Sequence, residues 1–249
     1  AIHHPSDRAF IARANIGPSK EHADAKLRWR LVDNAGTPIV RWTSLVLNRQ
    51  KDPSRYEQLI PIHTLSAQSI PAGSTLEYRI ETRDDRSDVQ SIQIVHPPKL
   101  QGVEIETTLP DYAQSIHDSA IPFLQGNTKL SPSSLSTGPI LAGSTITTSW
   151  TFDTEVHAKG TEPSESNTIT STQQINDSGT ITTVPIDKFG FSPRAAMDVF
   201  VRVVPDAPPE AIVQSPSTDL TIGQRAIIEL SGYVTDDLGL AAVSMNATI

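Results

Sequence analysis

The sequence predicts an all-β protein made of tandem β-sandwich domains, the last of which is incomplete. Most segments alternate apolar and polar residues with a period of two, the pattern of half-buried strands. Thr, Ile and Val are common, and Pro (19) outnumbers Gly (13) among the 249 residues, a composition typical of many short strands joined by turns. Two Pro-Pro joints, Pro97-Pro98 and Pro208-Pro209, lie about one hundred residues apart, the size of a single sandwich domain.

The alternation is clearest in the first part of the chain. Leu27, Trp29 and Leu31 share one face of a strand, and the turn at residues 33–36 follows them. The Asn and Gly of that turn tolerate the left-handed backbone that tight turns need. Residues 7–15 and 18–26 are the only stretches compatible with a helix. Further strands are expected at residues 39–47, 76–80, 91–95, 103–107, 146–152, 168–172, 180–185 and 199–204.

Each Pro-Pro joint directly follows an alternating strand, and adjacent prolines cannot donate to a ladder. The joints therefore predict three domains, at residues 1–98, 99–206 and 207–249. The third has strands only at 212–214, 226–230 and 243–249, too few to close a sandwich. Its uncovered apolar face predicts a partner, disorder or dimerisation by strand addition at that end. The chain starts at Ala1 and ends within an expected strand, so we expect a fragment of a longer protein.

One short string recurs, Ala-Gly-Ser-Thr followed by Leu or Ile, at residues 72–76 and 142–146. The first copy falls late in its domain and the second in the middle of its domain. This placement indicates a shared turn type and not a repeat unit.

Charge and composition exclude several classes of function. The formal net charge is -8 and the pI is about 5.3, which disfavours nucleic acid and anionic lipid as partners. Cysteine is absent, which excludes disulfides and thiolate chemistry. No apolar run reaches the roughly 20 residues of a membrane helix, so we expect no membrane insertion by this chain.

The string from Ile70 to Ile80, with its Pro-Ala-Gly turn before an alternating strand, resembles the tyrosine-corner region of fibronectin type III and related Ig-like domains. In those domains a Pro-Gly turn leads into a strand whose Tyr hydroxyl bonds back to the backbone. Tyr78 takes that place here, and Ala72 is an insertion relative to the usual pattern. The resemblance implies Ig-like or fibronectin III-like sandwiches.

Both joints are similar to those between stacked Ig-like domains of large, uncharacterised, planctomycete-type bacterial envelope proteins. The first pairs residues 97–100 with 103–105 and 110–112, and the second pairs 206–209 with 215–220 and 236–240. The resemblance implies an extracytoplasmic location, in the periplasm, at the cell surface or secreted, with anchoring through parts outside this chain. It brings no catalytic residue.

No motif carries chemistry. The GxSxG elbow, the phosphate-binding glycine loops and the HExxH spacing are absent, so we expect no catalytic residue and no enzyme activity. The seven histidines show no metal-ligand spacing, and adjacent His3 and His4 read as solvated imidazoles.

The acidic cluster Asp84, Asp85 and Asp88 is the strongest metal candidate, because Ca²⁺ prefers several hard oxygen ligands. Arg86 interrupts it, and a solvated turn is the competing interpretation. The same two interpretations apply to Asp236-Asp237, where a turn whose carboxylates accept backbone N–H groups competes with a metal site. Apart from Ca²⁺, no cofactor is expected.

Trp42 is the candidate ligand-binding residue, because sandwich domains that bind glycans use exposed aromatic platforms. It lies between Arg41 and Thr43, whereas Trp29 and Trp150 lie on apolar faces and belong to the expected core.

These observations leave three functions open. The first is a structural spacer or adhesion region of a cell-envelope or secreted protein, which contacts other domains of its parent or other envelope proteins. The second is a glycan- or protein-binding module. The third is an accessory region of a larger extracytoplasmic enzyme.

Overall fold

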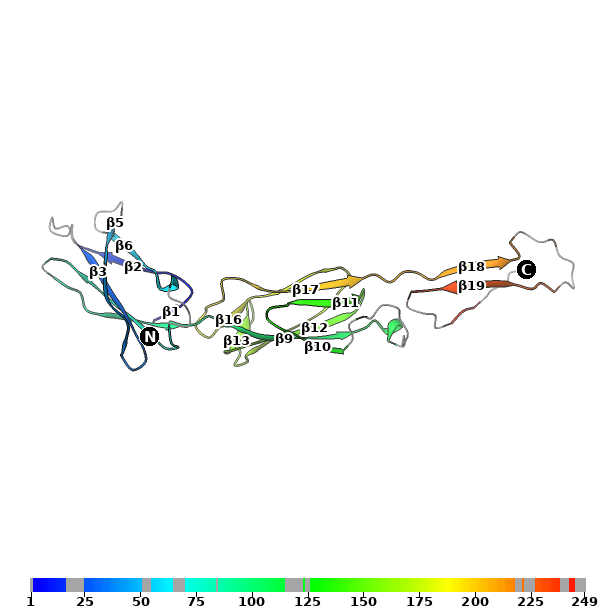
Figure 1. Cartoon of the computed structure of the whole chain (residues 1–249), viewed down its shortest axis with the longest axis horizontal. Coiled ribbons are helices and arrows are strands. Elements are labelled where there is room, and N and C mark those ends of the chain that lie inside the picture. Colours follow the sequence, from blue (N-terminus) through cyan, green and yellow to red (C-terminus); the bar gives the residue numbers. More distant parts are fainter. Residues whose placement is uncertain are drawn as a thin grey trace. The chain divides into compact units, whose positions relative to one another are not determined.

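The computed structural model (Figure 1) describes residues 2–16, 25–50, 55–64, 70–83, 85–114, 123, 126–217, 221, 227–237 and 242–244. In these residues the regular elements are strands and two short 3-10 helices, η2 (Ile62–Thr64) and η4 (Asp111–Ala113). The chain divides into two compact units. One holds Ala1–Lys99, Lys159–Pro163 and Val184–Ala195, and the other holds Leu100–Ala158, Ser164–Thr183 and Ala196–Ile249. The predicted all-β class is confirmed.

The first sandwich consists of two sheets. One sheet has the strand order β1-β8-β7-β3-β4 and the other has the order β2-β6-β5. The strands are β1 (His3–Pro5), β2 (Phe10–Asn15), β3 (Lys26–Val32), β4 (Pro38–Val46), β5 (Asn48–Arg49), β6 (Arg55–Ile60), β7 (Thr75–Glu81) and β8 (Gln90–Val95).

This arrangement is that of an Ig-like sandwich. The order β8-β7-β3-β4 matches the Ig strands G, F, C and C′, and β2-β6-β5 matches strands B, E and D. Strand β1 pairs with β8 in parallel, whereas the other pairs in both sheets are antiparallel. The predicted Ig-like class therefore follows from the hydrogen-bonding order and not only from the strand content.

The second sandwich repeats this parallel edge. Its sheets have the orders β10-β9-β12-β14 and β11-β17-β15, and β11 pairs with β17 in parallel. Its strands are β9 (Leu100–Thr108), β10 (Gly126–Leu130), β11 (Ser136–Leu141), β12 (Thr145–Phe152), β14 (Thr168–Gln174), β15 (Gly179–Thr183) and β17 (Met197–Val204). Two short strands, β13 (Val156–Ala158) and β16 (Pro185–Asp187), lie outside these two sheets, and β16 belongs to the first unit.

Each sandwich has its own hydrophobic core. In the first, Leu27 and Leu31 are fully buried and Trp29 is 6% exposed, because alternate side chains of β3 point inward. In the second, Ile105 on β9 is fully buried and Trp150 on β12 is 1% exposed. Neither core cluster contains a residue from the other side of Pro97-Pro98. The predicted core positions of Trp29 and Trp150 are confirmed.

The recurring Ala-Gly-Ser-Thr string forms the same turn in two different places. Gly73 and Gly143 have φ of 78° and 84°, and the next residue in each copy, Ser74 or Ser144, is fully buried. The first turn leads into β7 and the second into β12, which occupy different positions in their sandwiches. This agrees with the interpretation of a shared turn type.

Two sequence predictions about local structure need correction. Residues 7–15, which looked compatible with a helix, contain β2, because Phe10 and Ala12 alternate into the core; most of residues 18–26 lies outside the described residues. Tyr78 does lie on the expected strand, but within the described residues its ring packs against Phe10, with centroids 5.4 Å apart, and no hydrogen bond from its hydroxyl to the backbone is found. Burial raises the pKa of Tyr78.

The third segment is an antiparallel hairpin of β18 (Glu210–Ser215) and β19 (Ser231–Thr235). The expected strand at 226–230 is wrong over residues 227–230, which have no regular structure. The strand that pairs with β18 starts at Ser231, just after the end of the expected strand. It includes Gly232, where a Cβ would collide with the carbonyl oxygen of Ile212. Residues 242–244 are not a strand either, and 245–249 lie outside the described residues.

Apolar side chains of this hairpin are exposed in the part of the chain that the structure describes. Val213 is 67% exposed and Tyr233 is 47% exposed. They line an open groove of about 570 Å³. The expectation that a partner or a second copy covers this face stays a prediction.

Candidate functional site

Strands β3 and β7 carry alternating charged side chains on the outward face of the first sandwich. Arg30 on β3 donates through Nε to Glu77 on β7 at 2.6 Å. Arg79 donates through Nε to Glu81 at 2.8 Å, and Arg28 lies 3.8 Å from the same carboxylate group. The inward residues of both strands are apolar, so strand alternation alone brings these five charges onto one face.

Trp42 extends from the neighbouring strand β4 into this charged array. The Cζ atoms of Arg30 and Arg79 each lie 4.9 Å from the centroid of its ring, within the range of a cation–π contact. The ring is half-buried. Trp42 is therefore held in place by two guanidinium groups and is not a bare aromatic platform. We call Arg28, Arg30, Trp42, Glu77, Arg79 and Glu81 the Trp42 face.

Charge is distributed unevenly along the chain. The first 99 residues contain 14 of the 20 Lys and Arg residues and 11 of the 28 Asp and Glu residues. They therefore carry a formal charge of +3, and the remaining residues carry -11. The acidic whole-chain balance hides a cationic first sandwich, and a count per predicted domain would have revealed it.

The predicted calcium cluster is not assembled by the described residues. Asp84 lies outside them. Asp85 and Asp88 are exposed in the loop between β7 and β8, and a carboxylate oxygen of Asp85 accepts the backbone N–H of Arg86 at 2.8 Å. The backbone N–H of Asp85 donates to the hydroxyl of Thr82 at 3.1 Å. These contacts are those of an ordered polar turn, and calcium binding by this loop stays a prediction.

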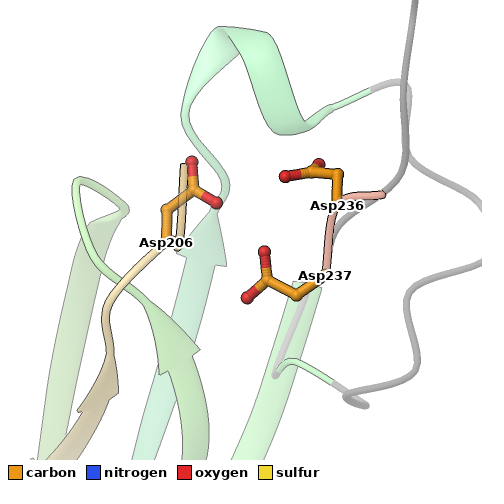
Figure 2. Close-up of side chains that lie close together, drawn as sticks. All are labelled: Asp206, Asp236 and Asp237. Atoms are coloured by element: carbon orange, nitrogen blue, oxygen red, sulfur yellow. The ribbon is translucent and has the colours of Figure 1, made fainter. Parts of the chain in front are cut away.

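Another acidic group comes together at the base of the β18–β19 hairpin. Oxygens of Asp206, Asp236 and Asp237 all lie within 4.8 Å of one another. Figure 2 shows the Asp236 carboxylate pointing toward Asp206. In the described part of the chain this is the one such group with metal-ligand spacing. Hard carboxylate oxygens suit Ca²⁺, and without a cation or a proton their charges repel.

Antiparallel pairing explains why these residues meet. Glu210 pairs with Thr235, so the segment before β18, with Asp206, lies beside the segment after β19, with Asp236 and Asp237. The sequence pattern predicted a turn at Asp236-Asp237 but gave no sign that Asp206 would join them. Predicting the hairpin with its true register would have placed the three side by side.

Tyr112, in η4, contacts the same group. Partial burial, a hydrogen bond from its hydroxyl to Asp206 and the negative charges of Asp206 and Asp237 all raise the pKa of Tyr112. The Tyr112 side chain remains 55% exposed. Its hydroxyl gives Asp206 a hydrogen-bond partner within the second unit.

Two histidines have structural contacts. His4, which was expected to be solvated, is half-buried, and its Nε2 lies 3.2 Å from the carbonyl oxygen of Arg8. The Nε2 of His96 lies 2.9 Å from the carbonyl oxygen of Ile70, and because a carbonyl only accepts, Nε2 carries the proton. Nδ1 then accepts the Ser6 hydroxyl at 2.8 Å. Ser6 is 6% exposed, and His96 is oriented by a carbonyl oxygen and not by a carboxylate. The Ser6–His96 hydrogen bond therefore serves to attach the segment after β1 to the end of β8.

Comparison with known proteins gives structural neighbours alone. No protein-family profile and no curated protein matches the chain. One similar solved structure is Dpr2 Ig1-Ig2 in complex with DIP-Theta Ig1-Ig3, with 12% identity, 86% of this chain covered and a TM-score of 0.22. Another is the Bacteroides ovatus mixed-linkage glucan utilization protein SGBP-B with a heptasaccharide, with 11% identity, 85% covered and a TM-score of 0.20.

The chain spans 66% of the length of either neighbour, slightly less than two thirds. At these TM-scores the overlays support no argument about function. The strand pairing itself defines the class: a tandem Ig-like β-sandwich protein. No helix in the described residues is long and apolar enough to cross a membrane.

Proposed function

We propose that this chain is a non-catalytic binding or adhesion region of an extracytoplasmic protein, and that the first sandwich binds its ligand through the Trp42 face. The observation that carries the proposal is the placement of Trp42 between two ion-paired arginines on an outward sheet face. An aromatic ring and guanidinium groups are the side chains most enriched in binding hot spots.

The proposal also covers the organisation and the location of the protein. The sandwiches correspond to domains 1–98 and 99–206, and residues 207–249 begin a third Ig-like domain. Separate cores on the two sides of Pro97-Pro98 support this division. A bacterial envelope protein with stacked domains, anchored by segments outside this chain, fits the Pro-Pro joints. The partners are then a glycan, another envelope protein or further domains of the same parent.

A screen of the full chain against arrayed glycans and envelope proteins tests this function. We expect capture of at least one ligand class by the wild type and its loss in Trp42→Ala, with an unchanged circular dichroism spectrum. Capture that is unaffected by Trp42→Ala, or no capture at all, contradicts the proposal.

A spacer role is the second candidate, and the repeated sandwich topology favours it. Both sandwiches close their sheets with a short strand parallel to the last strand, so each is a self-contained unit that can be stacked. A chain that binds nothing in the screen, but whose removal from the parent protein abolishes a function of a more distal domain, would be a spacer.

A further inference from the structure

The distribution of charge on the Trp42 face points to the chemical class of its ligand. Resting on the proposed binding function, we infer that this face binds an acidic polysaccharide, a polymer of sugars that carry carboxylate groups. The first step is the charge balance, because the face holds three guanidinium groups and two carboxylates. Lys26 adds a further cation on the same side of β3. An anionic ligand is attracted to this surplus.

Hydrogen bonding provides the second argument. A guanidinium group has five N–H donors. The ion pairs in the described residues engage Nε of Arg30 and Nε and Nη2 of Arg79, so these pairs do not use every donor of either group. The cation–π contacts hold both guanidinium groups over the Trp42 ring. A guanidinium that is already oriented loses less entropy when it binds a carboxylate.

The third step separates a sugar from other anions. Glu77 and Glu81 flank Arg79 along β7, and across the sheet they lie opposite Arg30 and Lys26. Their oxygens repel any phosphate or carboxylate that lies beside them, but they accept hydrogen bonds from hydroxyl groups, which the backbone of DNA lacks. A polymer in which hydroxyls outnumber carboxylates matches this arrangement of donors and acceptors.

The fourth step concerns apolar surface and length. A protein partner normally buries an apolar core in its interface. Strand β4, next to this face, exposes one large apolar side chain, Val46, which is its last residue, so the face does not offer such a core. The uncovered part of the Trp42 ring offers a small apolar patch to the C–H groups of one sugar. Along β7 the face runs from Glu77 to Glu81, which is about 13 Å at a rise of about 3.3 Å per residue, enough for a few sugar units of a polymer.

Affinity electrophoresis and calorimetry with the full chain test the inference. The probes are polygalacturonate, which carries carboxylates, dextran, which is neutral, and single-stranded DNA, which carries phosphates. We expect polygalacturonate to bind more tightly than the other two. Arg79→Gln should weaken binding about tenfold or more, since a charge-assisted hydrogen bond contributes about 1.5–3 kcal/mol. Trp42→Phe, which keeps an aromatic ring, should weaken it less than Trp42→Ala.

Arg13→Gln is the matched control. Arg13 lies on β2 in the other sheet, and its Nε also forms an exposed ion pair, with Glu57 at 2.8 Å. The control removes the same charge and the same kind of contact, so it should leave polygalacturonate binding within about twofold of the wild type. The unfolding midpoint of each variant shows whether a loss of binding reflects a loss of folded protein.

The other outcomes overturn the inference in distinguishable ways. Equal affinity for DNA shows non-specific attraction of polyanions. Equal affinity for dextran removes the role of the carboxylate but leaves a glycan-binding function intact. No binding of polygalacturonate, together with capture of another ligand that Trp42→Ala abolishes, refutes the acidic polysaccharide and keeps the proposed function. A loss of binding in Arg13→Gln as large as in Arg79→Gln places the site elsewhere.

Discussion

Replacing Ile105 by Ala in the core of the second sandwich should destabilise that sandwich and leave the first unchanged. The Ile105 side chain is fully buried among residues of one core cluster, and no residue of the first core belongs to that cluster. The substitution removes about three carbon atoms. At about 0.8 kcal/mol for each buried methylene, the transfer loss is about 2.4 kcal/mol, and the cavity raises the total to about 3–4 kcal/mol.

Calorimetry of the full chain is the assay. For a domain of roughly 100 residues, 1 kcal/mol shifts the melting temperature by about 4–8 °C, so Ile105→Ala should move one transition down by about 15 °C or more. Fluorescence assigns the transitions, because Trp29 and Trp42 report on the first sandwich and Trp150 on the second.

Leu76→Ala is the reciprocal variant. Leu76 is fully buried in the first core, so its replacement should lower the other transition by a similar amount. If either variant lowers both transitions equally, or if the whole chain melts in one two-state transition, the two cores are energetically coupled and the reasoning is refuted.

Three further predictions concern single side chains. Trp42→Ala should cost about 1–2 kcal/mol in urea unfolding of the first sandwich, because two cation–π contacts are lost; no change in the midpoint would show that the arginines do not hold the ring. Burial lowers the pKa of His4, so the unfolded state binds more protons below about pH 6.5. The first sandwich should therefore lose stability as the pH falls from about 6.5 through the lowered folded-state pKa, and the difference in melting temperature between wild type and His4→Gln from pH 7.5 to 5 should show this loss; parallel curves would contradict it. Asp206→Asn should lower the pKa of Tyr112, since it removes the nearest negative charge, and an NMR pH titration with no shift of that resonance would exclude the contact.

Much of the fold could be predicted from residue patterns. The period of two placed β3, β7, β8, β12 and β17 close to their true bounds, because each buries one face and therefore needs one apolar residue in two. The interpretation of residues 7–15 as compatible with a helix was wrong, because this stretch also buries alternate residues, as β2. Strand β2 is short, its exposed Ile11 breaks the alternation, and two of its inward residues, Ala12 and Ala14, are also good helix formers.

The candidate sites were predicted less well. Trp42 was selected as an exposed aromatic side chain, but its two guanidinium partners come from β3 and β7. Such contacts depend on which strands are neighbours, and strand order is not visible in the alternation of a single strand. Asp206 was missed because its neighbours in space follow the hairpin, about 30 residues further along the chain.

The sequence by itself determined that the chain folds into two-faced strands, and that cysteine and catalytic motifs are absent, since these are properties of composition and of local spacing. The tertiary structure alone decided that β1 and β11 close their sheets in parallel, that Arg30 and Arg79 meet over Trp42, and that three carboxylates converge beside Tyr112. The reason is physical: a side chain's direction follows from its position in a strand, but its neighbours across the sheet follow from pairing and register, which depend on segments far away in the sequence.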